Sequence, residues 1–108
     1  TVSIITAADN KVTQTVSVGK APHQLSFSRD GKYIFTAINA EHKVDVISTS
    51  NWKLINSIPV GRNPHIVLPM PDGKSVWVTS EGDNKIVKIN LDSMKVVAEI
   101  TAPLIGFI

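Results

Sequence analysis

The chain contains no cysteine. A disulfide framework, a cysteine-ligated zinc site and a CxxCH haem attachment are therefore excluded within these 108 residues, and the absence fits an oxidising compartment. No apolar run approaches the roughly 20 residues that a membrane-spanning helix needs. Charge of one sign is also scarce, because 11 Lys and Arg are interspersed with 9 Asp and Glu for a formal net charge of +2. We expect neither a nucleic-acid partner nor a membrane span.

Recognisable catalytic motifs are absent as well. The sequence has no Gly-x-Ser-x-Gly, no Walker A and no His-Glu-x-x-His pattern. Serines are plentiful, but none is placed with a histidine and an acid in a recognisable order. The sequence therefore favours a non-catalytic role and leaves an enzymatic one open.

What the chain does contain is an internal repeat. Residues 19–23, Gly-Lys-Ala-Pro-His, are followed by Asp-Gly-Lys at 30–32, and residues 61–65, Gly-Arg-Asn-Pro-His, are followed by Asp-Gly-Lys at 72–74. Each matching pair is separated by 42 positions. A fixed period of this size is typical of repeat architectures, and a unit of roughly 40–45 residues has the size of a four-stranded propeller blade.

Each unit of the repeat, called a row below, predicts four short strands and no helix. The second strand, at 33–37 and 75–79, is rich in β-branched and aromatic residues. We expect the first strand at 24–28 and 66–70, followed by a tight Asp-Gly turn in which glycine adopts a positive φ. Pro69 falls inside the second of these first strands, where we expect a short or bulged strand because proline lacks an amide donor.

These motifs resemble a known family. Gly-x-x-Pro-His, then Pro71-Asp72-Gly73-Lys74, then Val76-Trp77-Val78-Thr79-Ser80 resembles the YVTN-type β-propeller repeat. Such repeats occur in surface-layer proteins and in periplasmic propellers similar to the haem d1 domain of cytochrome cd1 nitrite reductase. The resemblance implies an all-β fold, a partial β-propeller built from four-stranded antiparallel blades with a 42-residue repeat.

The repeat also predicts how much of a propeller is present. Closed propellers use about 4 to 8 blades, whereas 108 residues supply about 2.6 blades. We expect residues 1–108 to be a fragment of a single propeller domain. Its expected parts are the end of one blade, a second blade, a third blade and the start of the next blade or a tail, at 1–18, 19–60, 61–102 and 103–108.

The polar residues of the repeat gather on the loops. In a propeller, loops that join the fourth strand to the next first strand share a face with loops that join strands two and three, and such loops commonly bind ligands. We expect the first strands to line the central channel, with two histidines at equivalent places near its mouth. The candidate ligand-binding residues on this face are Lys20, His23, Arg62, Asn63, His65, Glu81 and Asp83, with Asn39, Glu41, His42 and Asn84 beside them.

Two interpretations of His23 and His65 stay open. They could be ligands of a metal or haem iron, or acid–base groups. Alternatively, Pro-His recurs because the repeat recurs, with each imidazole bonded to local backbone. We expect neighbouring blades to hold the rings too far apart to share one small ion. Residues 81–84 similarly resemble either a calcium loop or a solvated turn, and the turn is favoured because few carboxylates are present.

The favoured function is a non-catalytic binding or scaffold module of a secreted, periplasmic or cell-surface propeller protein. Its ligand or partner protein would contact the loop face around the channel, and the remaining blades would be further partners. No cofactor or metal is predicted. The alternative, which the resemblance implies, is part of a periplasmic redox enzyme whose propeller holds a haem d1-like cofactor.

Overall fold

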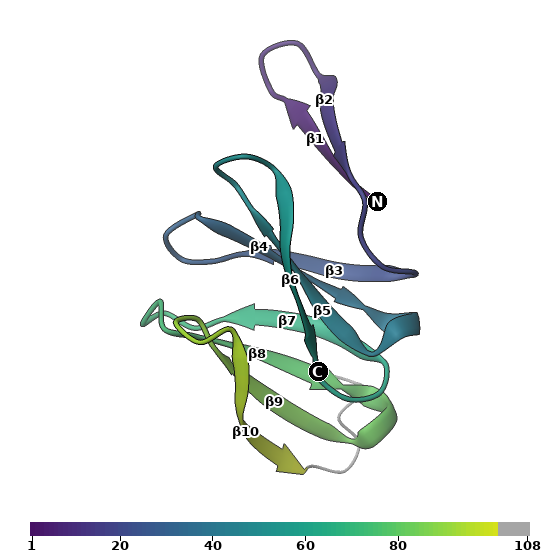
Figure 1. Ribbon diagram of the computed structural model, residues 1–108, viewed down its shortest axis with the longest axis vertical. Coiled ribbons are helices and arrows are strands. Elements are labelled where there is room, and N and C mark those ends of the chain that lie inside the picture. The colour runs from purple at the N-terminus through teal and green to yellow at the C-terminus, as the bar shows by residue number, and fades with distance from the viewer. Residues whose placement is uncertain (102–108) are drawn as a thin grey trace.

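A computed structural model describes residues 1–101, which fold as an all-β chain forming part of a β-propeller. Three antiparallel sheets follow one another along a body of 45 × 27 × 21 Å. A two-stranded hairpin stands at one end, and two four-stranded sheets follow it (Figure 1). The expected tail at 103–108 lies outside the described residues. No helix within residues 1–101 has the length and apolar character needed to cross a membrane.

The two full sheets repeat the same meander, which confirms the predicted fold class. The first sheet pairs β1 (Val2–Thr6) with β2 (Lys11–Val16). The second sheet is ordered β3-β4-β5-β6 and the third β7-β8-β9-β10, each strand pairing with its sequence neighbour. Their bounds are β3 Pro22–Phe27, β4 Tyr33–Ile38, β5 Lys43–Ser48, β6 Lys53–Pro59, β7 Pro64–Pro69, β8 Ser75–Ser80, β9 Lys85–Asn90 and β10 Lys95–Thr101.

The first strand of each sheet differs in detail from the sequence prediction. Both β3 and β7 begin at a proline, two residues earlier than expected. Proline is tolerated there because these are edge strands, whose first residue need not donate to a ladder. The expectation of a short or bulged strand is met only in part: β7 contains a register shift, but it lies between Pro64 and Val67, and the strand has six residues, as β3 does.

The Asp-Gly turns are present where the sequence predicts them. Gly31 and Gly73 have φ of +74° and +70°, and each donates its N–H to the carbonyl three residues before. The Asp30 carboxylate accepts hydrogen bonds from the Lys32 N–H and the Ser28 hydroxyl, and the pKa of Asp30 is lowered, mainly by the first of these. This stabilising contribution is present above the unfolded-state pKa and is lost as the pH falls through the folded-state pKa.

The core lies between the sheets. Phe35, Ala37 and Val44 of the second sheet are fully buried against valines of the third sheet, including Val76 and Val78. A smaller cluster joins the hairpin to the second sheet through Val2, Val16, Ile34 and Ile47. The outer strands β2, β6 and β10 are mostly exposed. Packing thus proceeds from sheet to sheet, as in a propeller.

Candidate functional site

The two predicted sets of loops lie together on one face of the molecule. The loop between β4 and β5 contains a 3₁₀ turn, η1 (Asn39–Glu41), and the loop between β8 and β9 contains η2 (Glu81–Asp83). The Asn39 N–H donates to the Ala21 carbonyl at 3.1 Å, and the Glu81 N–H donates to the Asn63 carbonyl at 3.2 Å. Each 3₁₀ turn is thereby held against the connection that enters the first strand of its own sheet.

His23 and His65 meet at this face. Both lie near the start of inner strands, β3 and β7, which are edge strands of adjacent sheets. Their ring centroids are 4.2 Å apart and the rings are nearly perpendicular, at 87°. The expectation that neighbouring blades hold them too far apart is therefore wrong, because the two edge strands converge here. Residues 1–101 nevertheless contain no cluster of three or more His, Cys, Asp or Glu side chains suited to a metal ion.

His65 is oriented by a carboxylate. Its Nδ1 contacts Oε1 of Glu81, which lies on η2, and both side chains are about one-third exposed. One interpretation of the sequence gave each imidazole a backbone partner, but the partner of His65 is an acidic side chain. A ring nitrogen engaged in this way fixes the orientation of the imidazole and leaves Nε2 as the nitrogen available to a ligand.

Two other acids of the face hold the loops in place. Asp83 accepts the backbone N–H of Arg62 at 2.9 Å, and its second oxygen lies 3.9 Å from the Arg62 guanidinium. At the equivalent position in the preceding row, Glu41 accepts the backbone N–H of Lys20. Because these carboxylates already accept hydrogen bonds from backbone N–H groups of the chain, residues 81–84 are better described as a hydrogen-bonded turn than as a calcium loop.

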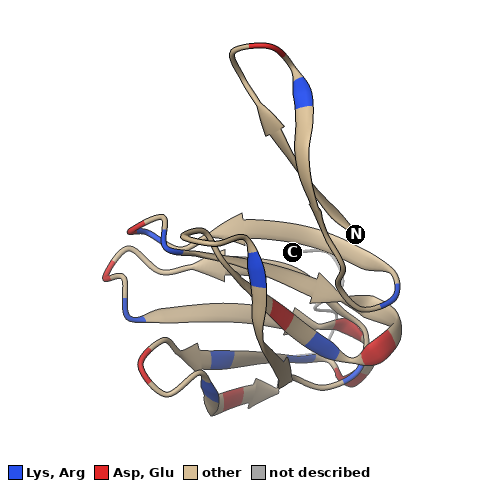
Figure 2. Cartoon of the chain, turned by 45° about the horizontal axis from the view of Figure 1, so that its top comes forward, with Lys and Arg blue, Asp and Glu red and all other residues tan. Residues whose placement is uncertain are grey.

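The side chains of Lys20 and Arg62 lie on the same face. Lys20 is exposed and the Arg62 side chain is 74% exposed. Residues of both charge signs are spread over the loops and strand ends (Figure 2). The carboxylates of Glu41, Glu81 and Asp83 accept hydrogen bonds within the chain, so the face presents cationic side chains next to acids that also order the loops.

Several residues that join the two sheets were not predicted as such. The Asn39 amide donates to the Pro64 carbonyl at 3.1 Å, and the Asn63 amide donates to Asn39 Oδ1 at 3.3 Å. Further along β3 and β7, Gln24 Oε1 accepts the Val67 N–H at 3.0 Å. The Ser26 hydroxyl donates to the Val67 carbonyl at 2.9 Å. The sequence signal for these contacts was that positions 24 and 26 carry polar residues, whereas the equivalent positions 66 and 68 of the repeat carry apolar ones.

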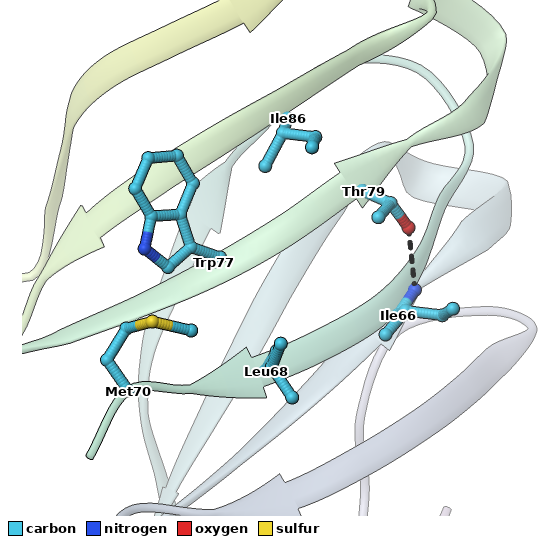
Figure 3. A pocket seen from close by; sticks show the side chains of 6 residues that line it. All are labelled: Ile66, Leu68, Met70, Trp77, Thr79 and Ile86. Carbon is cyan, nitrogen blue, oxygen red and sulfur yellow. Dashed lines mark hydrogen bonds between the residues drawn. The ribbon is translucent and has the colours of Figure 1, made fainter. Parts of the chain in front are cut away.

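A separate apolar cavity of about 290 Å³ lies on the outward face of the third sheet (Figure 3). Trp77, which its strand position predicts to pack between blades, covers one side of it, and the Ile66 N–H donates to Thr79 Oγ1 at 3.0 Å. The repeat equivalents of Trp77, Thr79 and Ile86 are Phe35, Ala37 and Val44, which the third sheet buries completely. We therefore interpret this cavity as a sheet-packing face. Its lining residues are Ile66, Leu68, Met70, Trp77, Thr79 and Ile86.

Comparison with known families fits this arrangement of sheets. The model of the cytochrome D1 heme domain matches residues 3–101. The chain belongs to the cytochrome D1 haem domain family. Comparison with the sequences of curated proteins finds no match.

Solved structures show the same fold in longer chains. Kuenenia stuttgartiensis hydrazine synthase is 27% identical with a TM-score of 0.89, over 94% of this chain and 29% of that chain. The dihydro-heme d1 dehydrogenase NirN in complex with DHE is 17% identical with a TM-score of 0.78, over 96% and 24%. AztD of Citrobacter koseri is 13% identical with a TM-score of 0.77, over 92% and 29%. The chain thus spans less than a third of each of these structures.

Proposed function

We propose that this chain is the ligand-binding part of a propeller protein in the periplasm, at the cell surface or outside the cell. Its ligand is a small carboxylate-bearing molecule that contacts the channel mouth and is held there without being transformed. The observation that carries the proposal is the imidazole pair of His23 and His65, contributed by inner strands of adjacent sheets. A site shared by two rigid sheets is pre-organised, which lowers the cost of binding.

The charges of the face support an anionic ligand. Lys20 and Arg62 are exposed at the entries of the second and third sheets, and Arg62 keeps a side chain that is 74% exposed although Asp83 lies 3.9 Å away. Arginine binds carboxylates through paired N–H donors, and the ammonium group of lysine offers further N–H donors. The arrangement therefore suits a carboxylate that bridges the two sheets.

The first prediction concerns a molecule that co-purifies with the protein. Native mass spectrometry of the full-length natural protein should show a bound mass, and the double variant His23→Gln/His65→Gln should lose it. Arg62→Gln should lower the affinity about tenfold, because it removes one charge-assisted interaction. Lys53→Gln is the matched control, since Lys53 is exposed at the start of the outer strand β6, and it should change nothing. Absence of a bound mass, or full occupancy in the double variant, would contradict the proposal.

A second candidate is favoured by the family match and by the similarity to the dihydro-heme d1 dehydrogenase NirN. In it, the propeller holds a haem d1-type group. The donor set fits such a group: His65, with Nδ1 engaged by Glu81, would offer Nε2 to the iron, and Lys20 and Arg62 would bind peripheral carboxylates. When bound, the group would supply redox chemistry. The chain's own contribution would be to orient the imidazole and to neutralise the carboxylates.

An absorbance spectrum separates the two candidates. A Soret-region band that follows the purified protein, and that shifts in Glu81→Gln because the imidazole loses its orienting carboxylate, would support the haem d1-type group. A bound mass without visible absorbance would support a colourless carboxylate and reject the haem candidate.

A further inference from the structure

The connection between β6 and β7 crosses from the second sheet to the third, and a single residue of the η1 loop holds both of its ends. The His42 carbonyl accepts the Val60 N–H at 3.2 Å. The His42 ring accepts the Asn63 N–H at 3.1 Å through Nδ1. His42 adopts a left-handed conformation with φ of 58°, which ends η1 and turns its ring toward this connection.

The ring contact depends on the protonation state of the imidazole. A neutral imidazole can accept at Nδ1, whereas an imidazolium carries a proton on both nitrogens and only donates. Protonation at Nδ1 would place an N–H against the N–H of Asn63, and the hydrogen bond could not persist. The carbonyl contact with Val60 needs no ring and would remain.

The repeat itself shows that histidine is not needed to build this loop. Asn84 occupies the equivalent position after η2, with φ of 51° and the same left-handed conformation. Asparagine adopts this conformation readily and has no group that titrates in the same range. The histidine therefore adds an acid-sensitive contact to a turn that asparagine also forms.

We propose that His42 is an acid-sensitive latch that secures the entry of β7 at neutral pH and releases it on acidification. The release is local, because the Asn39 amide still donates to the Pro64 carbonyl and the Gly82 N–H still donates to the Arg62 carbonyl. Its consequence is greater mobility at Asn63, two residues before His65. The latch does not require the proposed ligand and stands without it.

Other charged groups of this face also respond to pH or set the local field. The carboxylates of Glu41, Glu81 and Asp83 contact the backbone of Lys20, the ring of His65 and the backbone of Arg62 respectively. Protonation of His65 strengthens its contact with Glu81, so it opposes loosening rather than causing it. The titratable and charged groups from the surrounding elements are Lys20, His23, Glu41, Lys43, Asp45, Arg62, His65, Glu81, Asp83 and Lys85.

Amide hydrogen exchange of the full-length natural protein tests the latch. Exchange of the Asn63 amide, corrected for the intrinsic pH dependence, is measured between roughly pH 8 and pH 5, the range in which imidazoles titrate. We expect protection to fall about tenfold on acidification, since a hydrogen bond worth about one kcal/mol or more is lost. In His42→Asn, which introduces the residue found at the equivalent position after η2, protection should be lower at pH 8 and independent of pH.

Two further measurements keep the test decisive. Amides of Val67 and Val78 should stay protected throughout, which shows that the variant and the acidified protein remain folded. His65→Gln should retain the pH dependence at Asn63, which assigns it to His42. The proposal is overturned if acidification leaves the protection of Asn63 unchanged in the wild type. It is also overturned if acidification lowers that protection equally in His42→Asn.

Discussion

Replacing Asp45 with alanine is expected to lower the free energy of unfolding by about 3–5 kcal/mol, the usual cost of removing one partner from a buried ionic group. Asp45 is fully buried in β5. Its carboxylate accepts the Gly19 N–H at 2.8 Å and the Ser57 hydroxyl at 2.6 Å, and lies 3.3 Å from Lys43 Nζ. Alanine would leave all three donors without their acceptor.

The partners of Asp45 supply the controls. Ser57→Ala removes one donor and leaves the carboxylate bonded to Gly19 and Lys43, so it should cost about 1 kcal/mol. Asp45→Asn keeps an acceptor oxygen and should fall between the two. Urea unfolding of the full-length natural protein measures all three. An Asp45→Ala variant no less stable than Ser57→Ala would show that the carboxylate is not the centre of this cluster.

Gly61→Ala is expected to cost roughly 3 kcal/mol, because backbone strain and overpacking each contribute about 1–3 kcal/mol. Gly61 has φ of +110°, which L-residues rarely adopt. A Cβ there would lie 2.8 Å from Lys85 Cε and 2.9 Å from Asp83 Oδ2. The added methyl group would therefore displace the carboxylate that accepts the Arg62 N–H.

Gly73→Ala separates the two contributions. Gly73 also has a positive φ, at +70°, but a Cβ there would meet only Arg29 Cβ at 3.9 Å. Strain alone should then cost about 1 kcal/mol. Thermal or urea unfolding of both variants gives the comparison, and equal losses would mean that the loop around Gly61 relaxes freely.

The sequence predicted the strands well because their signals are local. The fixed spacing and the Asp-Gly turns placed the β3–β4 and β7–β8 hairpins, since turn chemistry depends on adjacent residues. The starts of β3 and β7 were missed because a proline at the first residue of an edge strand looks like a loop residue. Pro69 does not shorten β7, because its missing amide matters little at the end of an edge strand.

The equivalent placement of the two histidines on the fold was predicted, but their contacts were not. Repetition placed His23 and His65 at equivalent points, yet their separation depends on how closely the inner strands of two sheets converge. The pairing of His65 with Glu81 depends on the 3₁₀ turn that carries Glu81 to the strand entry. The bond from Asn63 to His42 joins the third sheet to a loop of the second. Contacts between two sheets have no signal within a single repeat unit.

The side chains that bridge β3 and β7 make successive rows of this repeat unequal building blocks. Gln24 and Ser26 bond the N–H and the carbonyl of Val67, whereas their counterparts Ile66 and Leu68 have nothing to donate or accept. If a copy of either row followed the third sheet, the N–H and the carbonyl equivalent to those of Val67 in that copy would find no side-chain partner on β7. Each repeat unit is therefore specific to its place beside its neighbour.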